Sequence, residues 1–142
     1  MKKSIVIASD HAGYKLKSSL IKHIRNKSFI DLGTNSEKKV DYPDYAKKLV
    51  KQIKDKRHVK GILICGSGIG MSIAANRFKG IRASLCFTPE MAKLSRKHND
   101  ANILVLPGRF IDVKTAKLCI DKFINTNFDG NRHLKRIKKI DR

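Results

Sequence analysis

Short, continuous apolar runs alternate along the chain with segments in which apolar residues recur every three or four positions. Continuous runs are typical of strands buried on both faces, and the recurring pattern is typical of helices with one apolar face. Strands are therefore predicted over residues 5–9, 29–32, 61–65, 83–87 and 103–106. The predicted helices have the apolar faces Leu16, Leu20 and Ile24; Ala46, Leu49, Val50 and Ile53; residues 71–78; Met91, Ala92 and Leu94; and Ala116, Leu118, Cys119, Ile120 and Phe123.

The alternation of strands and helices predicts a parallel sheet with helices on both faces, which is a doubly wound α/β domain. With 142 residues, of which 41% are hydrophobic, the chain has the size of a single domain, expected over residues 1–142. Ligands of such sheets bind at the carboxyl ends of the strands. Polar residues follow three of the predicted strands, and we expect them to lie together: Asp10 and His11, residues 65–70, and residues 107–109.

The segment 61–76 carries the strongest chemical signal, because an apolar strand leads into Cys65 and a glycine-rich turn. Gly66, Gly68 and Gly70 allow backbone N–H groups to approach a ligand closely, and the following helix directs its positive end to the same place. This arrangement favours a bound phosphate or enolate and the thiolate form of Cys65. It indicates proton transfer on a phosphorylated substrate. In the alternative interpretation, Cys65 is a small core residue without a chemical role.

The glycine-rich turn does not match the common nucleotide-binding motifs. Met71 stands where the G-x-G-x-x-G pattern needs its third glycine, and no Gly-Lys-Ser/Thr sequence follows. Glu90 lies after another predicted strand, at about the spacing that a ribose contact would need. A nicotinamide-dependent oxidoreductase therefore stays open as a less favoured alternative.

Residues at the ends of other predicted elements fit acid-base chemistry. Asp10 and His11 follow the first strand, and His98 and Asn99 end the fourth helix. Together with Cys65 they would place a carboxylate, two imidazoles and a thiol at one rim of the sheet. The alternatives are a helix cap at Asp10 with an incidental histidine, and a structural helix end at His98. Four other residues are expected to be surface or core groups, namely His23 and His58 at the surface and Cys86 and Cys119 in the core.

The last segment, residues 129–142, is a distinct basic tail. Arg132 and Arg136 are four residues apart and would share one face of a helix, where paired guanidinium groups can grip a phosphate. Because basic residues are so abundant here, a solvated face is the alternative for this pair.

The formal net charge of +20, from 32 Lys and Arg against 12 Asp and Glu, raises nucleic acid as a possible partner. However, the lysines are scattered over most predicted helices, and only 6% of residues are aromatic, so a platform for stacking bases is not indicated. A nucleic-acid-binding protein is thus a less favoured alternative. The charge predicts attraction of small anionic substrates.

The cytoplasm is the expected location. Three widely spaced cysteines do not suggest a disulfide framework, and no Cys/His grouping has zinc spacing. Asp10 and His11 arrive too soon for the hydrophobic region of a signal peptide, and no apolar run approaches the ~20 residues of a membrane span. We therefore expect no membrane association.

Seven segments of the chain closely resemble the B type of ribose-5-phosphate isomerase, in a family that includes the galactose-6-phosphate isomerase subunits. The segments are Ser9-Asp-His-Ala-Gly13, Asp41-Tyr-Pro43, residues 61–76, Gly80-Ile-Arg-Ala83, Leu94-Ser-Arg-Lys-His-Asn-Asp100, Gly108-Arg109 and Gly130-Asn-Arg-His-Leu-Lys-Arg136. The resemblance implies a Rossmann-like three-layer α/β/α domain, working as a dimer or a pair of dimers without metal or nucleotide cofactor. It also implies interconversion of D-ribose 5-phosphate and D-ribulose 5-phosphate in the pentose phosphate pathway.

The resemblance further implies a role for each matching residue. Cys65 would be the base that moves a proton between C2 and C1 through a cis-enediolate, and the Ser67 hydroxyl would shuttle a proton between the oxygens. His98 would assist ring opening, with Asp10 nearby. The remaining implied substrate contacts are the backbone of Gly66, Ser67, Gly68, Ile69 and Gly70 around the enediolate; Asn99 on sugar hydroxyls; His11, Arg109, Arg132 and Arg136 on the phosphate; and Tyr42 and His133.

In this family some of the phosphate-binding arginines come from the neighbouring subunit, so the tail 129–142 is expected to contact a second copy. Some relatives act on six-carbon sugar phosphates such as allose or galactose 6-phosphate, which leaves a hexose-6-phosphate isomerase as the alternative. A galactose-6-phosphate isomerase divides its catalytic residues between two different subunits, whereas this chain carries the full set.

Overall fold

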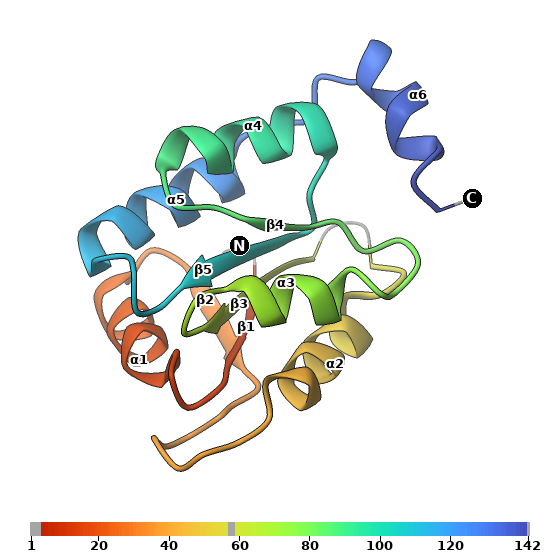
Figure 1. The fold of residues 1–142 in the computed structure, drawn as a ribbon. Helices are drawn as coiled ribbons and strands as arrows, with labels where there is room; N and C mark the ends of the chain where they lie inside the picture. The colour runs from red at the N-terminus through yellow and green to blue at the C-terminus, as the bar shows by residue number, and fades with distance from the viewer. Residues whose placement is uncertain (1–3, 57–58, 142) are drawn as a thin grey trace.

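A parallel sheet of five strands forms the centre of the structure, a computed structural model that describes residues 4–56 and 59–141. The strands lie in the order β2-β1-β3-β5-β4 (Figure 1). Their bounds are β1 Ser4–Ser9, β2 Ser28–Asp31, β3 Lys60–Cys65, β4 Ala83–Leu85 and β5 Ile103–Pro107. The predicted five-stranded parallel sheet is confirmed. His58, expected at the surface, lies outside the described residues.

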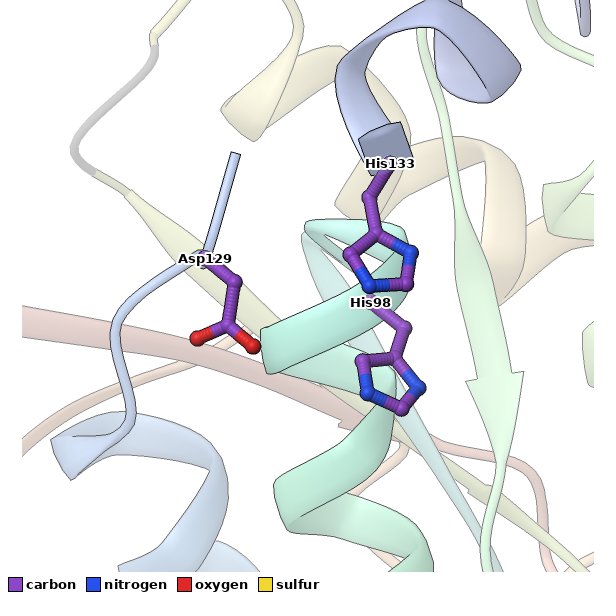
Figure 2. Close-up of side chains that lie close together, drawn as sticks. All are labelled: His98, Asp129 and His133. Carbon is purple, nitrogen blue, oxygen red and sulfur yellow. The ribbon is translucent and has the colours of Figure 1, made fainter. Parts of the chain in front are cut away.

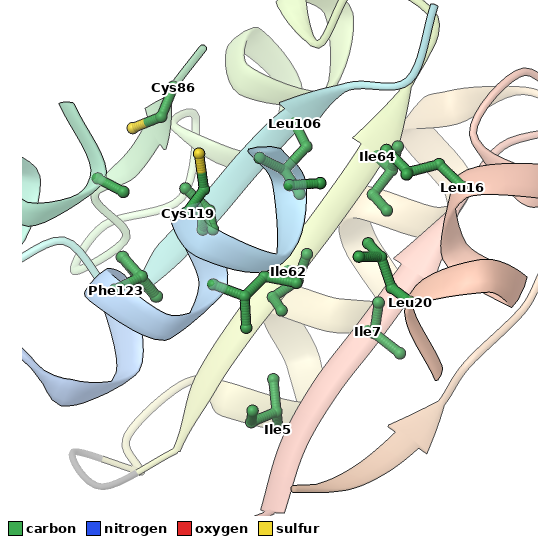
Figure 3. Packing of buried hydrophobic residues seen from close by; sticks show 14 of the residues in the cluster. Ile5, Ile7, Leu16, Leu20, Ile62, Ile64, Cys86, Leu106, Cys119 and Phe123 are labelled. Atoms are coloured by element: carbon green, nitrogen blue, oxygen red, sulfur yellow. The ribbon is translucent and has the colours of Figure 1, made fainter. Parts of the chain in front are cut away.

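Helices cover both faces of the sheet, as the alternation of elements predicts. They are α1 Tyr14–His23, α2 Tyr42–Ile53, α3 Ile69–Ala75, α4 Pro89–Asn99, α5 Val113–Asn125 and α6 Arg132–Lys138. Ile5 and Ile7 of β1 pack with α1, α4 and α5, whereas Val6 and Ala8 pack with α2 and α3. Figure 3 shows the first of these two layers, with side chains of α1 and α5 directed onto the central strands. Successive strand residues thus face opposite layers, as a strand requires.

The edge strands differ from the prediction that all five strands are buried. In β2 only Phe29 is partly buried, and Ile30 is 45% exposed. At the other edge, β4 has three residues and ends at Leu85, although the apolar run continues to Phe87. The two strands at the edges of the sheet are exposed or only partly buried, whereas nearly all residues of the three central strands are buried. An apolar run alone does not distinguish a central strand from an edge strand.

The third helix begins and ends earlier than predicted, spanning Ile69–Ala75 instead of 71–78. Gly68 has a left-handed backbone with φ of 77° and starts the helix directly after the turn. At the other end, the side-chain amide of Asn76 donates to the carbonyl of Ala83 at 2.9 Å and accepts from its N–H at 2.8 Å. This pair of hydrogen bonds leads the chain out of the helix toward β4.

The apolar faces predicted for the fourth and fifth helices are partly wrong. Met91, Leu94 and Leu118 are 40%, 38% and 47% exposed. The buried side of α4 consists of the small residues Ala92 and Ser95 together with Arg96. The last helix, α6, packs beside the C-terminal end of α4 and away from the sheet (Figure 1).

Candidate active site

The candidate active site lies where β1 and β3 are neighbours. The chain passes from β1 outward to β2 and then returns to β3 on the other side of β1, so the direction of winding changes between β1 and β3. Open α/β sheets bind ligands at such a point, outside the carboxyl ends of the strands. A pocket of about 370 Å³ occupies this place, and its lining residues are Asp10, His11, Ala12, Tyr42, Cys65, Gly66, Ser67, Gly70, Arg109 and Phe110.

The pocket joins the three loops that the sequence places at the carboxyl ends of strands. Asp10 and His11 follow β1, Cys65 ends β3, and Arg109 follows β5. The Arg109 loop is fastened to the glycine-rich turn, because the N–H of Gly108 donates to the Cys65 carbonyl at 2.8 Å. The N–H of Arg109 donates to the carbonyl of Gly66 at 2.9 Å. The cationic side chain of Arg109 is therefore held against Gly66, the first residue of the glycine-rich turn.

Burial raises the pKa of the Cys65 thiol above its ordinary value. The backbone N–H groups of Met71, Gly68 and Ser67 donate to the sulfur and oppose this rise, whereas the nearby Asp10 carboxylate adds to it. Desolvation of a buried anion outweighs the three hydrogen bonds, since Cys65 is only 4% exposed. The prediction that the turn lowers the pKa is wrong for the net effect, although its amides do act in the predicted direction.

Two glycines bring the loops of the pocket close together. Gly68 adopts φ of 77°, a backbone conformation that is costly for residues with a side chain. Gly13 has an ordinary φ, but a Cβ placed there would lie 2.4 Å from the carbonyl oxygen of Ile64 on β3. The start of α1 therefore packs directly on the end of β3, which keeps the loop after β1 next to Cys65.

Asp10 accepts a hydrogen bond in the turn before α1 and also lines the pocket. Its Oδ1 accepts from the N–H of Gly13 at 3.0 Å, and the residue is 6% exposed. Gly13 is the N-cap residue of α1 and no side chain caps the helix, so Asp10 is not the helix cap of the alternative interpretation but an acceptor in the turn before the helix. The same residue lines the pocket.

His11 is held by the loop that follows β2. The backbone N–H of Val40 donates to Nδ1 of His11 at 3.2 Å, so Nδ1 is the acceptor and Nε2 carries the proton. The loop itself is anchored by Lys17, whose buried ammonium donates to Asp31 at 2.5 Å and to the carbonyl of Thr34 at 2.7 Å. His11 is therefore presented as a hydrogen-bond donor, which suits an anionic ligand.

His98, Asp129 and His133 form a second cluster of chemically active side chains (Figure 2), and none of the three lines this pocket. His98 of α4 and His133 of α6 stack with ring centroids 4.4 Å apart and an interplanar angle of 13°. The Asp129 carboxylate lies beside them, and one donor atom from each residue falls within 4.8 Å of the others. Desolvation lowers the pKa of His133, as do, to a smaller extent, the charges of Arg132, His98 and Arg136.

The prediction that His98 shares one rim with Cys65 is wrong within a single chain. A helix that connects parallel strands runs back along the sheet, so α4 starts at the carboxyl edge and ends at the opposite edge. Arg82, which precedes β4, donates from Nε to the Asn99 carbonyl at 2.9 Å and so marks that opposite edge. None of five residues expected at the site lines the pocket: His98, Asn99, Arg132, His133 and Arg136.

Some residues of the site were not found from the sequence, and others lie outside the pocket. Ala12 and Phe110 line the pocket but were not expected there. Phe110 is 71% exposed, and the only sequence signal for its place at the pocket was its position directly after Gly108-Arg109. Gly68 is buried behind the pocket, and the side chain of Ile69 is 54% exposed outside it. Glu90 is exposed in the first turn of α4 and does not line the pocket.

The remaining predictions on single residues are confirmed. His23 is exposed, and Cys86 and Cys119 are buried in the core. All three cysteines lie in the described part of the chain and are free. Within residues 4–56 and 59–141, no helix has the length and apolar character needed to cross a bilayer.

Comparison with known proteins gives a consistent result over nearly the whole chain. Residues 5–140 match the family described as Ribose/Galactose Isomerase. Ribose-5-phosphate isomerase B of Escherichia coli is 41% identical over 140 residues, which are 97% of this chain and 94% of the relative. The crystal structure of a ribose 5-phosphate isomerase from Thermotoga maritima superposes with a TM-score of 0.96 at 53% identity and covers 99% of both chains. Ribose-5-phosphate isomerase B of Mycoplasma genitalium, solved with bound ribulose 5-phosphate, has a TM-score of 0.91 at 40% identity and covers 96% of this chain and 93% of its own.

Proposed function

The chain belongs to the ribose/galactose isomerase family, and we propose that it interconverts D-ribose 5-phosphate and D-ribulose 5-phosphate with Cys65 as the base. The observation that carries this proposal is the place of Cys65, which lines the pocket and whose sulfur receives three backbone N–H groups. The solved structure from Mycoplasma genitalium, which holds ribulose 5-phosphate, supports the substrate. The reaction is an aldose–ketose isomerisation of the pentose phosphate pathway and needs no cofactor.

The chemistry moves one carbon-bound hydrogen between neighbouring carbons. In the open-chain aldose, the Cys65 thiolate takes the proton from C2, and the electrons of that bond pass to the C1 carbonyl and give a cis-enediolate. The Ser67 hydroxyl shuttles a proton from O2 to O1, and the thiol returns its proton to C1 to give the ketose. The N–H groups in the turn from Gly66 to Gly70 that do not donate to the Cys65 sulfur hold the enediolate oxygens, where each donor can be worth about 3 kcal/mol.

The phosphate and the sugar hydroxyls need several cationic and polar groups. His11, through its Nε2 proton, and Arg109 are available at the pocket of one chain. Tyr42 lines the same pocket and contacts the sugar. Arg132, Arg136 and His133 on α6, and His98 and Asn99 at the end of α4, complete the substrate contacts from a second copy of the chain. His98 then assists opening of the furanose ring, with Asp10 across the substrate.

Apolar side chains on the surface support this dimer or dimer of dimers. Several large apolar residues of α3, of α4 and of the loop before α4 are 38–54% exposed in the single chain: Ile69, Ile73, Phe87, Met91 and Leu94. The free energy falls when a second surface covers exposed apolar groups and removes them from water. The basic tail 129–142 contacts the neighbouring subunit in this arrangement.

The hexose-6-phosphate alternative rests on the family description, which includes galactose. A coupled assay that compares ribose 5-phosphate with allose 6-phosphate and galactose 6-phosphate tests both functions. We expect turnover of the pentose phosphate at the higher kcat/KM. A higher kcat/KM for a hexose phosphate would replace the proposed substrate.

The same assay tests the base. Replacing Cys65 by Ala should lower kcat by about 10²–10⁴-fold, the usual contribution of a positioned base, while circular dichroism shows an intact fold. Cys86→Ala is the matched control, because it removes a buried thiol that does not line the pocket. A Cys65→Ala enzyme as fast as the wild type would end the thiolate mechanism.

A cytoplasmic location is part of the proposal. Its support is that Cys65, Cys86 and Cys119 are all free, as is usual for proteins of reducing compartments.

A further inference from the structure

We propose that His98, Asp129 and His133 form a binding site for a divalent transition-metal ion such as Zn²⁺, and that metal bound there inhibits the isomerase. The inhibition rests on the proposed function, because it uses the role of His98 in ring opening. Binding of the ion does not rest on it.

The donor set suits such an ion. Two imidazole nitrogens and one carboxylate oxygen are ligands that zinc binds in proteins with an open fourth position, whereas Mg²⁺ and Ca²⁺ prefer oxygen donors alone. The three donor atoms lie within 4.8 Å of one another. Tetrahedral donors at about 2.0–2.1 Å from one zinc lie about 3.3–3.4 Å apart, so donor atoms that are now up to 4.8 Å apart have to approach one another by up to about 1.5 Å.

The contraction requires side-chain rotations that the surroundings permit. The two rings are nearly parallel, so their nitrogen lone pairs do not yet meet at one point. His98 is only partly buried and Asp129 is exposed, and both can turn toward His133. Figure 2 shows the Asp129 carboxylate on the side where each ring presents one of its nitrogens.

His133 supplies an independent observation. The residue is 5% exposed, and among the described residues its Nε2 has no hydrogen-bond partner. A buried polar atom without a partner carries a free-energy cost, which a bound ion would remove. In Figure 2 the ring nitrogen farther from the His133 backbone lies on the side of His98 and Asp129, so this atom faces the cluster.

Nearby cations limit the affinity. Lys97 lies 3.9 Å from the Asp129 carboxylate, and Arg132 and Arg136 flank His133 on α6. Their charges repel a dication, so coordinate bonds from the neutral imidazoles have to provide the binding. We therefore expect binding of soft or borderline ions such as Zn²⁺ and Co²⁺ and no binding of Mg²⁺.

Calorimetric titration of the chelator-treated full chain with ZnCl₂ tests the site directly. Asp129→Asn should raise the Kd for Zn²⁺ at least about tenfold, and His133→Asn should do the same. Asp121→Asn, which removes an exposed carboxylate on α5, is the matched control and should leave the Kd unchanged. Unchanged Kd values in both cluster variants would overturn the site.

The thiol of Cys65 is the rival ligand, and a second measurement separates it from the cluster. Cys65→Ala should keep zinc binding, and Co²⁺ should bind the wild type without a thiolate-to-metal charge-transfer band. Loss of binding in Cys65→Ala, or appearance of that band, would assign the metal to the thiol and reject the cluster.

Activity measurements test the inhibition on its own. Zn²⁺ should slow turnover of ribose 5-phosphate by the wild type, and Asp129→Asn, which has no part in the proposed chemistry, should keep its basal activity while needing at least about tenfold more zinc for the same inhibition. Zinc that binds the cluster without slowing turnover would overturn the inhibitory role. If the chain turned over no sugar phosphate at all, the titrations alone would decide the binding site.

Discussion

At the scale of single residues, Cys65 shows two opposing effects on one sulfur. The N–H groups of Ser67, Gly68 and Met71 stabilise the thiolate, but burial and the Asp10 carboxylate destabilise it more. The thiol is therefore mostly protonated at neutral pH in the free chain. In the proposed mechanism Cys65 reacts through this minor ionised fraction, which then controls the rate.

The raised pKa of Cys65 predicts how activity depends on pH. The proposed base is the deprotonated form of Cys65. Below the pKa, the fraction in this form increases about tenfold for each pH unit. We expect kcat/KM, which reports the free enzyme, to rise from pH 7 to pH 9, and the rate of iodoacetamide alkylation to rise in parallel. Cys65→Ala should show no such alkylation. A kcat/KM that is flat over this range would contradict a protonated Cys65 as the resting state.

At the scale of elements, the site depends on how closely α1 approaches β3. The N–H of Gly13 holds the Asp10 carboxylate, and the missing Cβ of Gly13 allows contact with the backbone of Ile64. The obstacle is a backbone carbonyl in the central part of the sheet, which cannot move aside as the end of a side chain can. The spacing between Asp10 and Cys65 is thus set by one glycine.

Replacing Gly13 by Ala should push α1 away from β3. We expect a loss of about 1–3 kcal/mol in the free energy of unfolding, measured with urea, together with a lower kcat because Asp10 and His11 shift away from Cys65. Gly80→Ala is the comparison, since Gly80 has φ of 82° but open space around it. It should cost about 1–2 kcal/mol from backbone strain and leave kcat unchanged. Equal effects of both variants on kcat would show that the close approach of α1 does not position the site.

The elements also show what the sequence can predict. Asp10, His11, Cys65 and Arg109 were found because each follows an apolar run, and the carboxyl ends of parallel strands share one edge. The sequence did not reveal the exposure of the edge strands and of Met91, or the place of Phe110 at the pocket. The hydrophobic pattern along the chain is the same whether an apolar residue is covered by its own chain or by another molecule.

The placement of His98 shows a different limit. Its chemistry and its position at a helix end were clear from the sequence, but strand and helix alternation puts that helix end at the edge opposite Cys65. The family resemblance names the residue without saying which copy provides it. Asp129 was not found, because no local pattern links it to two histidines on other elements.

At the scale of the whole molecule, the proposed function predicts that the two sets of groups meet between two chains. Cys65→Ala and His98→Asn should each be inactive alone. After unfolding and refolding together, mixed dimers of a two-fold assembly contain one site with both defects and one site with none, so roughly a quarter of the wild-type activity should return. A coupled assay on the mixed and unmixed samples measures this. Failure of the mixture to regain activity, with mixed dimers demonstrated by mass spectrometry, would rule out sites shared between chains.

Because α4 carries His98 to the edge of the sheet opposite Cys65, a solitary chain holds two half-sites that never meet. The proposed shared site then predicts that specific activity depends on enzyme concentration. Dilution below the dissociation constant of the dimer should abolish turnover while each chain stays folded, and recovery on concentration should follow second-order kinetics.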